Sequence, residues 1–338
     1  MREVFNKMRK IFILCFLILS NLLVYAQEGN SAFTYLLLPN SARAAALGGT
    51  NISIIENDLS LIYQNPSFLG QEMDKTINLN YLSYVGDIKA GSATFAKALG
   101  EKSAWGIGFN YFNYNNMLET TKNDEILGDL SASDICGNIF FSSDLTESIR
   151  GGITGKFVYS NYWNNTAIGL GVDLGISYYN RDKDLSIGLV GKNLGRQVKA
   201  YEEELLNLPW DIQLGFSQKL GHAPIRYSVT AVNLARWKSY DLQGKREPFS
   251  KAFFKHFIFG VEILPTENFW IAAGYNVKRG SDMSLTVNDG NGNTFGGFSA
   301  GAGLKVKSFS IGCSVAKYHP AATSFMISIS TSLAEMKL

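Results

Sequence analysis

Three groups of residues have types and spacings that chemistry could use. Ser314-Val315-Ala316-Lys317 has the Ser-x-x-Lys spacing of serine acyl enzymes, in which the hydroxyl attacks a carbonyl carbon. Asp289-Gly290-Asn291-Gly292-Asn293 has the alternating oxygen ligands with which a calcium loop begins. His222, His256 and His319 are the candidates for a zinc site. Each group depends on the element that would position it.

None of the three groups fits its chemistry. A Ser-x-x-Lys pair must share one face of a helix, but we expect a strand over 308–317, where residues three apart point to opposite sides. The acidic loop has Thr294 where a calcium loop needs Gly, and Ala300 where it needs a bidentate Glu. The histidines are too scattered for a zinc motif. The sequence predicts no enzyme, no metal and no cofactor, and a hairpin loop at 289–293.

The composition excludes several classes of protein. Charged residues make up 18% of the 338 residues, against roughly 25% in typical soluble domains. Aromatic residues reach 13%, and the chain has 33 Gly but only 7 Pro and 3 Cys. Disorder, collagen-like repeats and a disulfide scaffold are therefore excluded. With 31 basic against 29 acidic residues and no basic block, nucleic acid is not an expected partner.

The first segment predicts export. Arg2, Lys7, Arg9 and Lys10 precede the apolar run Ile11–Val24, and Val24-Tyr25-Ala26 offers a cleavage site. The alternative is a retained membrane anchor, but the run is shorter than the ~20 residues that a spanning helix needs. We therefore expect residues 1–26 to be a cleaved signal peptide.

The body of the chain alternates with a period of two from Thr76 onward. In 167–179, for example, the even positions from Ile168 to Tyr178 are apolar, whereas the odd positions are small or polar. Successive side chains of a strand point to opposite faces, so this pattern predicts strands with one apolar face. About fourteen strands follow from it, most of them near the ~9–11 residues that cross a bilayer: 76–84, 88–98, 103–113, 132–142, 148–160, 166–179, 184–193, 209–220, 224–234, 255–264, 268–278, 296–306, 308–317 and 323–333.

The connections favour a barrel over a secreted β-sandwich. Short polar links, such as 180–183 and 265–267, alternate with longer ones at 114–130, 194–208, 235–255 and 278–294. The polar strand faces are rich in Gly and Ser rather than Lys and Glu, and aromatic residues gather near strand ends. We predict an all-β protein whose residues 76–338 form a closed antiparallel transmembrane β-barrel.

Residues 27–75 precede the first strand and do not alternate. Pro39, Gly48, Gly49 and Pro66 interrupt regular structure in this segment. Glycine on the inner face of the barrel would let another segment pack closely against it. We therefore predict that residues 27–75 form an N-terminal hatch, or plug, inside the barrel.

Several stretches resemble the PorQ and PorV proteins of the type IX secretion system. Phe33–Gly49 and Glu56–Leu61 are similar to the opening of these families, which are FadL-like barrels. Asn65-Pro66-Ser67 resembles their Asn-Pro-Ala motif, with Ser67 in place of Ala. Leu208–Gly215 and Lys219–Thr230 resemble PorQ in particular. The residues that carry the motif in the hatch are Pro39, Ser41, Arg43, Gly48, Gly49, Asn65 and Pro66.

The resemblance implies a fold, a location and a role. It implies a FadL-like barrel of fourteen strands with a hatch, in the outer membrane of Bacteroidota-type cells and in contact with its lipid and lipopolysaccharide. PorQ-like proteins belong to the attachment complex with PorU, PorV and PorZ, and hold PorZ at the cell surface. That complex trims secreted cargo and joins it to a lipopolysaccharide, and the cleaving activity belongs to PorU. The expected function is therefore non-enzymatic anchoring.

A transporter of hydrophobic small molecules is the alternative, as is common among FadL-like barrels. It would require a lateral opening, a kinked strand and an apolar pocket beside the hatch, and Gly151-Gly152 and Gly296-Gly297 are candidates for such kinks. Within the hatch, we expect Arg43 to form an ion pair in the lumen and Gly48-Gly49 to make a tight bend. These residues serve either the stability of the plug alone or a direct contact with a partner.

Overall fold

The computed structural model describes residues 31–335, apart from residues 87, 115–116, 121–125, 131, 164, 238, 240–245, 287–294 and 320–321. The predicted signal peptide at 1–26 and the acidic loop at 289–293 lie outside the described residues.

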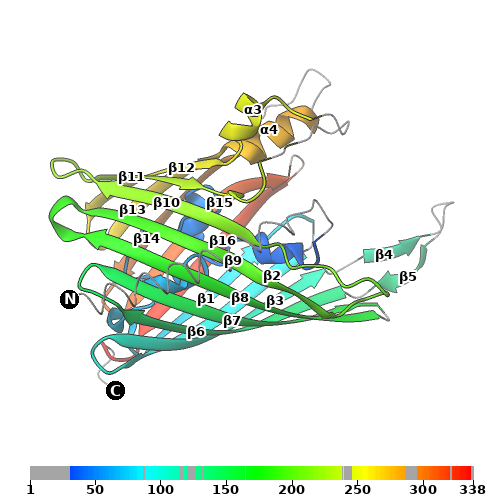
Figure 1. Ribbon diagram of the computed structural model, residues 1–338, viewed down its shortest axis with the longest axis horizontal. Helices are drawn as coiled ribbons and strands as arrows, with labels where there is room; N and C mark the ends of the chain where they lie inside the picture. Colours follow the sequence, from blue (N-terminus) through cyan, green and yellow to red (C-terminus); the bar gives the residue numbers. More distant parts are fainter. Residues whose placement is uncertain are drawn as a thin grey trace, which may run out of the picture.

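Fourteen antiparallel strands close into a barrel (Figure 1). Closure comes from the pairing of the first and last strands, in which Thr76 lies opposite Ser332. The predicted closed antiparallel barrel is therefore confirmed, and most predicted strands agree with the observed ones to within a few residues. The strands are β1 Thr76–Ser83, β2 Ile88–Leu99, β3 Ser103–Tyr114, β6 Ala132–Asp144, β7 Ile149–Tyr162, β8 Asn165–Asn180, β9 Leu185–Lys199, β10 Asp211–Lys219, β11 Ile225–Ala231, β12 Phe257–Thr266, β13 Phe269–Asn276, β14 Phe298–Val306, β15 Phe309–His319 and β16 Ala322–Ser332.

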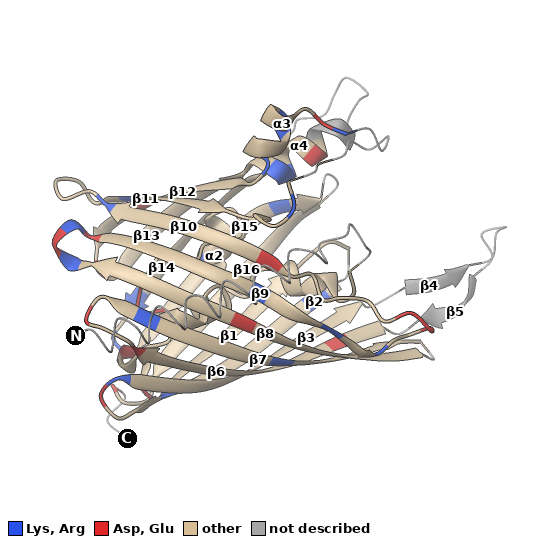
Figure 2. Ribbon diagram, viewed as in Figure 1, with Lys and Arg blue, Asp and Glu red and all other residues tan. Residues whose placement is uncertain are grey.

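The two faces of the barrel wall differ in the way that the alternation predicts. Large apolar side chains such as Ile139, Phe157 and Leu170 are exposed on the outside. Polar side chains such as Asn78, Thr94 and Ser217 are buried on the inside. Figure 2 shows many of the charged residues at turns and strand ends, and only scattered charged residues within the strands. Such an apolar outer surface is unfavourable in water and favourable in lipid. In the described part of the chain, no helix combines the length and the apolar character that crossing a membrane requires.

The two ends of the barrel are unlike. At one end, here called the turn end, β1 begins, β16 finishes and short turns join the strands. The opposite end, here called the loop end, carries three projecting features, which Figure 1 shows above and to the right of the wall. They are the hairpin of β4 Met117–Thr120 and β5 Ile126–Leu130, helix α3 Phe249–Phe254 and helix α4 Val277–Thr286.

The predicted connections need three corrections, all at the loop end. Strand β9 continues to Lys199, so the link expected from Leu194 starts later, because the Gly195 region still pairs with β8. The link expected from Lys278 begins with helix α4, which starts where β13 stops pairing. The link expected at 114–130 contains the β4–β5 hairpin.

The hatch, residues 31–75, lies inside the barrel. It consists of short helices joined by turns: η1 Thr34–Leu37, α2 Ala42–Ala46, η2 Leu59–Tyr63, η3 Pro66–Phe68 and η4 Gln71–Met73. The hydrophobic core forms where these helices meet the inner wall, as when Phe68 and Tyr63 pack with Phe140. The wall itself contributes few large apolar groups inside, because its apolar side chains face outward. The hatch thus supplies the core that the barrel interior lacks.

Glycines on the wall make room for the hatch. A Cβ atom at Gly152 would collide with the backbone of Pro66, and one at Gly188 with the carbonyl group of Ile52. Gly151-Gly152 therefore does not kink its strand as the transporter alternative required, since β7 pairs without interruption there. Gly297 does adopt a positive φ of 86°, just before β14 begins. The pairing is irregular between β8 and β9, beside Asp173 and Asn193, and the register also shifts between β12 and β13 and between β15 and β16.

Candidate functional site

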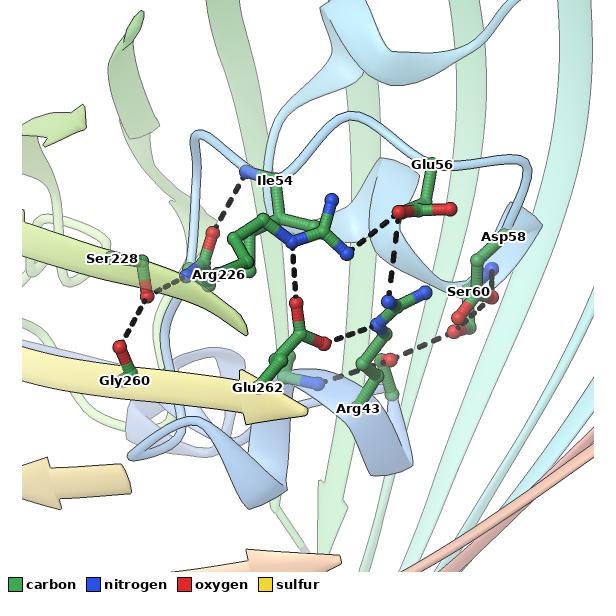
Figure 3. Close-up of polar contacts among 12 residues, drawn as sticks. Arg43, Ile54, Glu56, Asp58, Ser60, Arg226, Ser228, Gly260 and Glu262 are labelled. Atoms are coloured by element: carbon green, nitrogen blue, oxygen red, sulfur yellow. Dashed lines mark hydrogen bonds and ion pairs between the residues drawn. The ribbon is translucent and has the colours of Figure 1, made fainter. Parts of the chain in front are cut away.

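Four charged side chains join the hatch to the wall inside the lumen. We call Arg43, Glu56, Arg226 and Glu262 the ionic cluster. Arg43 Nε lies 2.6 Å from one carboxylate oxygen of Glu262, and Arg226 Nε lies 2.7 Å from the other. Glu56 Oε1 lies 2.6 Å from Arg226 Nη2 and 3.7 Å from Arg43 Nη2. Figure 3 shows the two guanidinium groups converging on the two carboxylates.

The charges of the ionic cluster cancel, which is why they can be buried. Glu262, on β12, is 0% exposed, and Arg226, on β11, is nearly buried. Burial opposes the charged form of Glu56, but Arg43 and Arg226 outweigh it and lower the pKa of the carboxyl. Burial likewise opposes the charge on Arg43, but Glu262 and Glu56 raise the pKa of the guanidinium. A pair of this kind is costly to break because the charge left behind has no water.

Helix α2 holds Arg43 in place. Ser41 caps its first turn by accepting a hydrogen bond from Ala44 N at 3.3 Å. The hydroxyl of Ser60 donates to that of Ser41 at 2.7 Å, which ties η2 to α2. Ala42 N donates to Ser328 Oγ on β16 at 2.8 Å, so the helix is also fastened to the wall. The predicted motif residues Ser41 and Arg43 thus belong to the same helix: Ser41 caps α2, and Arg43 extends from it into the ionic cluster.

Gly48 and Gly49 form the bend that follows α2. Their φ angles are 96° and 98°, a region in which residues with a side chain are strained. Gly48 N donates to Ser299 Oγ at 2.9 Å, and Arg279 Nη2 donates to Gly48 O at 3.3 Å. A Cβ atom at Gly48 would collide with Ile258. The bend is therefore pressed against β12–β14 and has no room for a larger residue.

Asn65 and Pro66 lie elsewhere in the lumen, against β7 and β8. Asn65 caps η3 by accepting hydrogen bonds from Ser67 N at 3.0 Å and Ser67 Oγ at 2.6 Å. Its amide donates to Ile52 O at 3.0 Å, which joins two parts of the hatch. Ser67, at the position where the resembled proteins have Ala, thus uses its hydroxyl for a hydrogen bond. Pro39 is also buried, but it lies outside both the contacts around Arg43 and those around Asn65.

A second polar group joins β7, β8, β9 and the hatch. Lys156 Nζ lies 2.7 Å from Asp173 Oδ2 and donates to Asn193 Oδ1 at 2.5 Å. Asn193 N donates to Asp173 Oδ1 at 2.6 Å, within the irregular pairing of β8 and β9. Lys192 Nζ donates to Tyr63 O at 2.5 Å. The hatch is therefore held by charged side chains on two sides of the barrel.

The two wall residues of the ionic cluster, Arg226 and Glu262, were not predicted from the sequence. Arg226 and Glu262 stand at inward positions of strands whose other inward residues are mostly small or uncharged. A charge at the inward parity of a membrane strand is the signal that would have identified them. Ser314 and Lys317 lie on strand β15, with Ser314 buried in the wall. The expected strand is thus present, and it holds the two residues apart.

The outer wall carries a shallow apolar groove across β3 and β6–β9. Its cavity volume is about 830 Å³. The groove exists because Gly137 and Gly155 face outward with open space where side chains would be. Ile107, Ile139 and Phe157 stand around it. The groove is accessible to the lipid that surrounds such a wall.

Known proteins match this chain in fold rather than in sequence. No family model matches it, and no curated protein does. The toluene transporter TodX of Pseudomonas putida is 13% identical over 87% of this chain and 97% of its own, with a TM-score of 0.51. The monoaromatic hydrocarbon channel CymD is 12% identical over 88% and 98%, with a TM-score of 0.53. A TodX mutant lacking S2 and S3 is 12% identical over 87% and 99%, with a TM-score of 0.55. The predicted FadL-like barrel fold is confirmed.

Proposed function

We propose that this chain is a non-enzymatic outer-membrane barrel that holds protein partners at its loop end, as a PorQ-like component of the type IX secretion system. The observation that carries this proposal is the hatch, which is fastened inside the lumen by the ionic cluster. A transporter must open a path past its hatch. Breaking a buried ion pair costs about 3–5 kcal/mol, so this hatch resists displacement. An anchoring protein needs no path through its barrel, so a hatch that stays in place is compatible with this function.

The loop end offers a surface for a partner. Helix α3 presents Phe249 and Phe254, which are 71% and 57% exposed, and Trp237 stacks on Phe253 beside them. Aromatic residues are enriched at the centres of protein interfaces because they bury a large area for little loss of entropy. Exposed rings of this size are unfavourable in water unless something covers them.

Ion pairs hold this surface in shape. Lys255 Nζ lies 2.8 Å from Glu247 Oε2 and 3.0 Å from Asp282 Oδ1, so it joins α3 to α4. Lys251 adds a second pair to Glu247 at 2.8 Å. Burial opposes the charge of Glu247, but hydrogen bonds from Lys251, Lys255 and Ser239 together outweigh it and lower the pKa of this carboxyl to about 2. These ion pairs connect the segment that carries the rings to α4, and such preorganisation reduces the entropy lost on binding.

The resemblance supplies the partners in this proposal. We assign PorZ to the surface of α3, with PorU and PorV in the same assembly at the outer membrane, where lipid and lipopolysaccharide surround the wall. Residues 1–26 would direct export and be cleaved. The motif residues of the hatch would then serve plug stability, because the described contacts of Arg43, Gly48 and Asn65 are all within the barrel.

The test is surface display of PorZ in a strain that lacks this protein. The strain is complemented with the wild type, with F249A/F254A, or with L220A, which removes an exposed apolar side chain at the turn end. We expect the wild type and L220A to restore surface PorZ, and F249A/F254A to leave most of it in the medium. Full surface PorZ without the protein would reject the anchoring function. Full restoration by F249A/F254A would reject the surface on α3.

A channel for a hydrophobic small molecule is the second candidate. The apolar groove on the outer wall favours it, together with the fold shared with TodX and CymD. On this proposal a ligand would leave the barrel sideways between β8 and β9, where the pairing is irregular. Proteoliposomes containing this chain should then take up toluene faster than liposomes without it. Equal uptake would reject the channel.

A further inference from the structure

A cavity of about 240 Å³ opens at the loop end between the start of the hatch and the wall. It is separate from the ionic cluster and from the surface of α3. Five aromatic side chains line it, and so does one carboxylate; no Lys or Arg belongs to its described lining. The aromatic residues are Phe33 and Tyr35 from the hatch, Tyr114 and Tyr162 from the wall, and Tyr201 from the β9–β10 connection.

The carboxylate is that of Asp134, near the first residue of β6. It is 6% exposed, and no cation among the described residues forms an ion pair with it. Tyr114 OH donates to Asp134 Oδ2 at 2.6 Å, and Ser160 Oγ donates to Oδ1. Burial opposes the charged form of this carboxylate, the two hydroxyl groups favour it, and neither hydroxyl neutralises the charge. A buried charge without a partner is unfavourable, so the cavity is suited to a positive charge.

The aromatic rings strengthen this preference. The face of an aromatic ring carries negative potential and attracts an ammonium group, most strongly where water is excluded. The rings are held by their neighbours: Tyr35 packs on Phe112 at 4.6 Å between centroids, and Phe33 faces Tyr201 at 6.5 Å. Tyr201 OH in turn donates to Ser160, which touches Asp134. The hydroxyl group of Tyr35 is buried in the described structure without a hydrogen-bond partner.

We infer that this cavity binds a small organic ammonium ion. The charged nitrogen would lie at Asp134, within the aromatic rings, and a short apolar chain would extend toward the opening. The volume of about 240 Å³ is below the ~300 Å³ at which drug-sized ligand sites begin, so the bound group is small. This site does not depend on the proposed anchoring function.

The test is calorimetric titration of the full chain in a nonionic detergent at constant ionic strength. The probes are butylammonium, 1-butanol and butyrate, which share a four-carbon skeleton and differ in charge. We expect butylammonium to bind at least tenfold more tightly than 1-butanol, which corresponds to about 1.4 kcal/mol. Butyrate should not bind. Equal binding of the ammonium and the alcohol, or no binding of the ammonium, overturns the proposal without any variant.

Two variants locate the site. D134N removes the charge and keeps an oxygen acceptor, so it should weaken butylammonium binding at least tenfold and leave 1-butanol unchanged. D182N changes an exposed carboxylate in the β8–β9 turn, and should bind like the wild type. Y162L removes an exposed ring of the cavity and should weaken butylammonium binding several-fold. Unchanged affinity in D134N shows that the ion binds elsewhere and overturns the assignment.

Discussion

At the scale of single residues, the hatch depends on buried charges that cancel one another. Glu262 accepts a hydrogen bond from Arg43 and another from Arg226, one on each carboxylate oxygen. Glu262 therefore lies within 2.7 Å of both arginines, whereas Glu56 lies that close to Arg226 alone. Glu56 completes the cluster from the hatch side and is about one-third exposed. The central carboxylate thus matters more than the one at the edge.

The first prediction concerns Glu262→Gln. This substitution leaves two guanidinium groups sharing Glu56, so we expect the free energy of unfolding to fall by about 3–5 kcal/mol. Denaturant unfolding in detergent, followed by the fluorescence of the five tryptophans, measures the change. Trp270, whose ring centroid lies 5.3 Å from Arg43 Cζ, contributes to this signal. Glu335→Gln removes an exposed pair with Lys305 and should cost no more than about 1 kcal/mol. Equal losses in the two variants would contradict the role of the ionic cluster.

The second prediction concerns pH. The pKa of Glu56 is lower in the folded chain than in the unfolded one, where it is about 4.3. Its contribution to stability is therefore complete above that value and is lost as the pH falls through the folded pKa. We expect wild type to be more stable than Glu56→Gln at pH 7 and the difference to shrink below about pH 4. A difference that stayed constant from pH 7 to pH 3 would exclude this ionisation as its cause.

At the scale of elements, the wall is built to receive the hatch. Some of its inward glycines touch the hatch, such as Gly152 and Gly188, whereas Gly303 makes room for the Trp270 ring of the neighbouring strand. Outward glycines such as Gly137 and Gly155 face open space. The same residue type therefore serves different purposes on the two sides of the strands.

The third prediction compares Gly188→Ala with Gly155→Ala. A methyl group at position 188 would collide with the backbone of Ile52, which cannot move aside as a flexible side chain would. We expect a loss of about 1–3 kcal/mol for Gly188→Ala. At position 155 the methyl group meets nothing, so stability should be unchanged or rise by up to about 1 kcal/mol. The midpoint of thermal unfolding in detergent distinguishes them, and a larger loss at 155 would contradict the packing described.

Helix α4 is an element that the alternation of apolar and polar residues did not predict. The residues from Lys278 to Asp282 are polar, unlike those of β13, and Gly280 within them is unfavourable in a helix. The side chain of Asn276 accepts a hydrogen bond from Arg279 N at 3.0 Å and so caps the first turn. Asn276 also donates to Gly48 O at 3.4 Å. The helix thus begins where β13 meets the bend of the hatch, a contact distant in sequence.

At the scale of the whole molecule, anchoring and transport make opposite demands on the hatch. An anchor works with the hatch immobile, whereas a channel must let it shift. Ser53 on the hatch and Ser217 on β10 lie with their hydroxyl oxygens 2.5 Å apart and are both fully buried. Replacing both with Cys would place two thiols within reach of a disulfide that joins hatch to wall.

The fourth prediction uses this pair, S53C/S217C. If the chain is an anchor, the oxidised variant should keep full surface PorZ, and reduction should change nothing. If the chain is a channel, oxidation should abolish toluene uptake and reduction should restore it. The single variant S217C controls for the loss of the hydroxyl. Loss of surface PorZ on oxidation alone would show that anchoring needs a mobile hatch and would contradict our proposal.

The sequence by itself determined the class of fold. A period of two over fourteen segments of membrane-crossing length permits few arrangements, because every backbone group in lipid must be paired and only closure achieves this. The interrupted stretch that contains Pro39, Gly48 and Pro66 was likewise recognisable as a segment unlike the strands, since its residues break both periods.

Only the tertiary structure decided how the hatch is held. Arg43 is separated from Glu262 by 219 residues, and no local pattern links them. Which inward position of which strand comes to face α2 depends on the register around the whole barrel. The cavity at Asp134 depends in the same way on three strands, the hatch and a loop. The alternation of apolar and polar residues determines on which side of the wall a residue lies. The partner that the residue contacts there is determined by the way in which the strands close into a barrel.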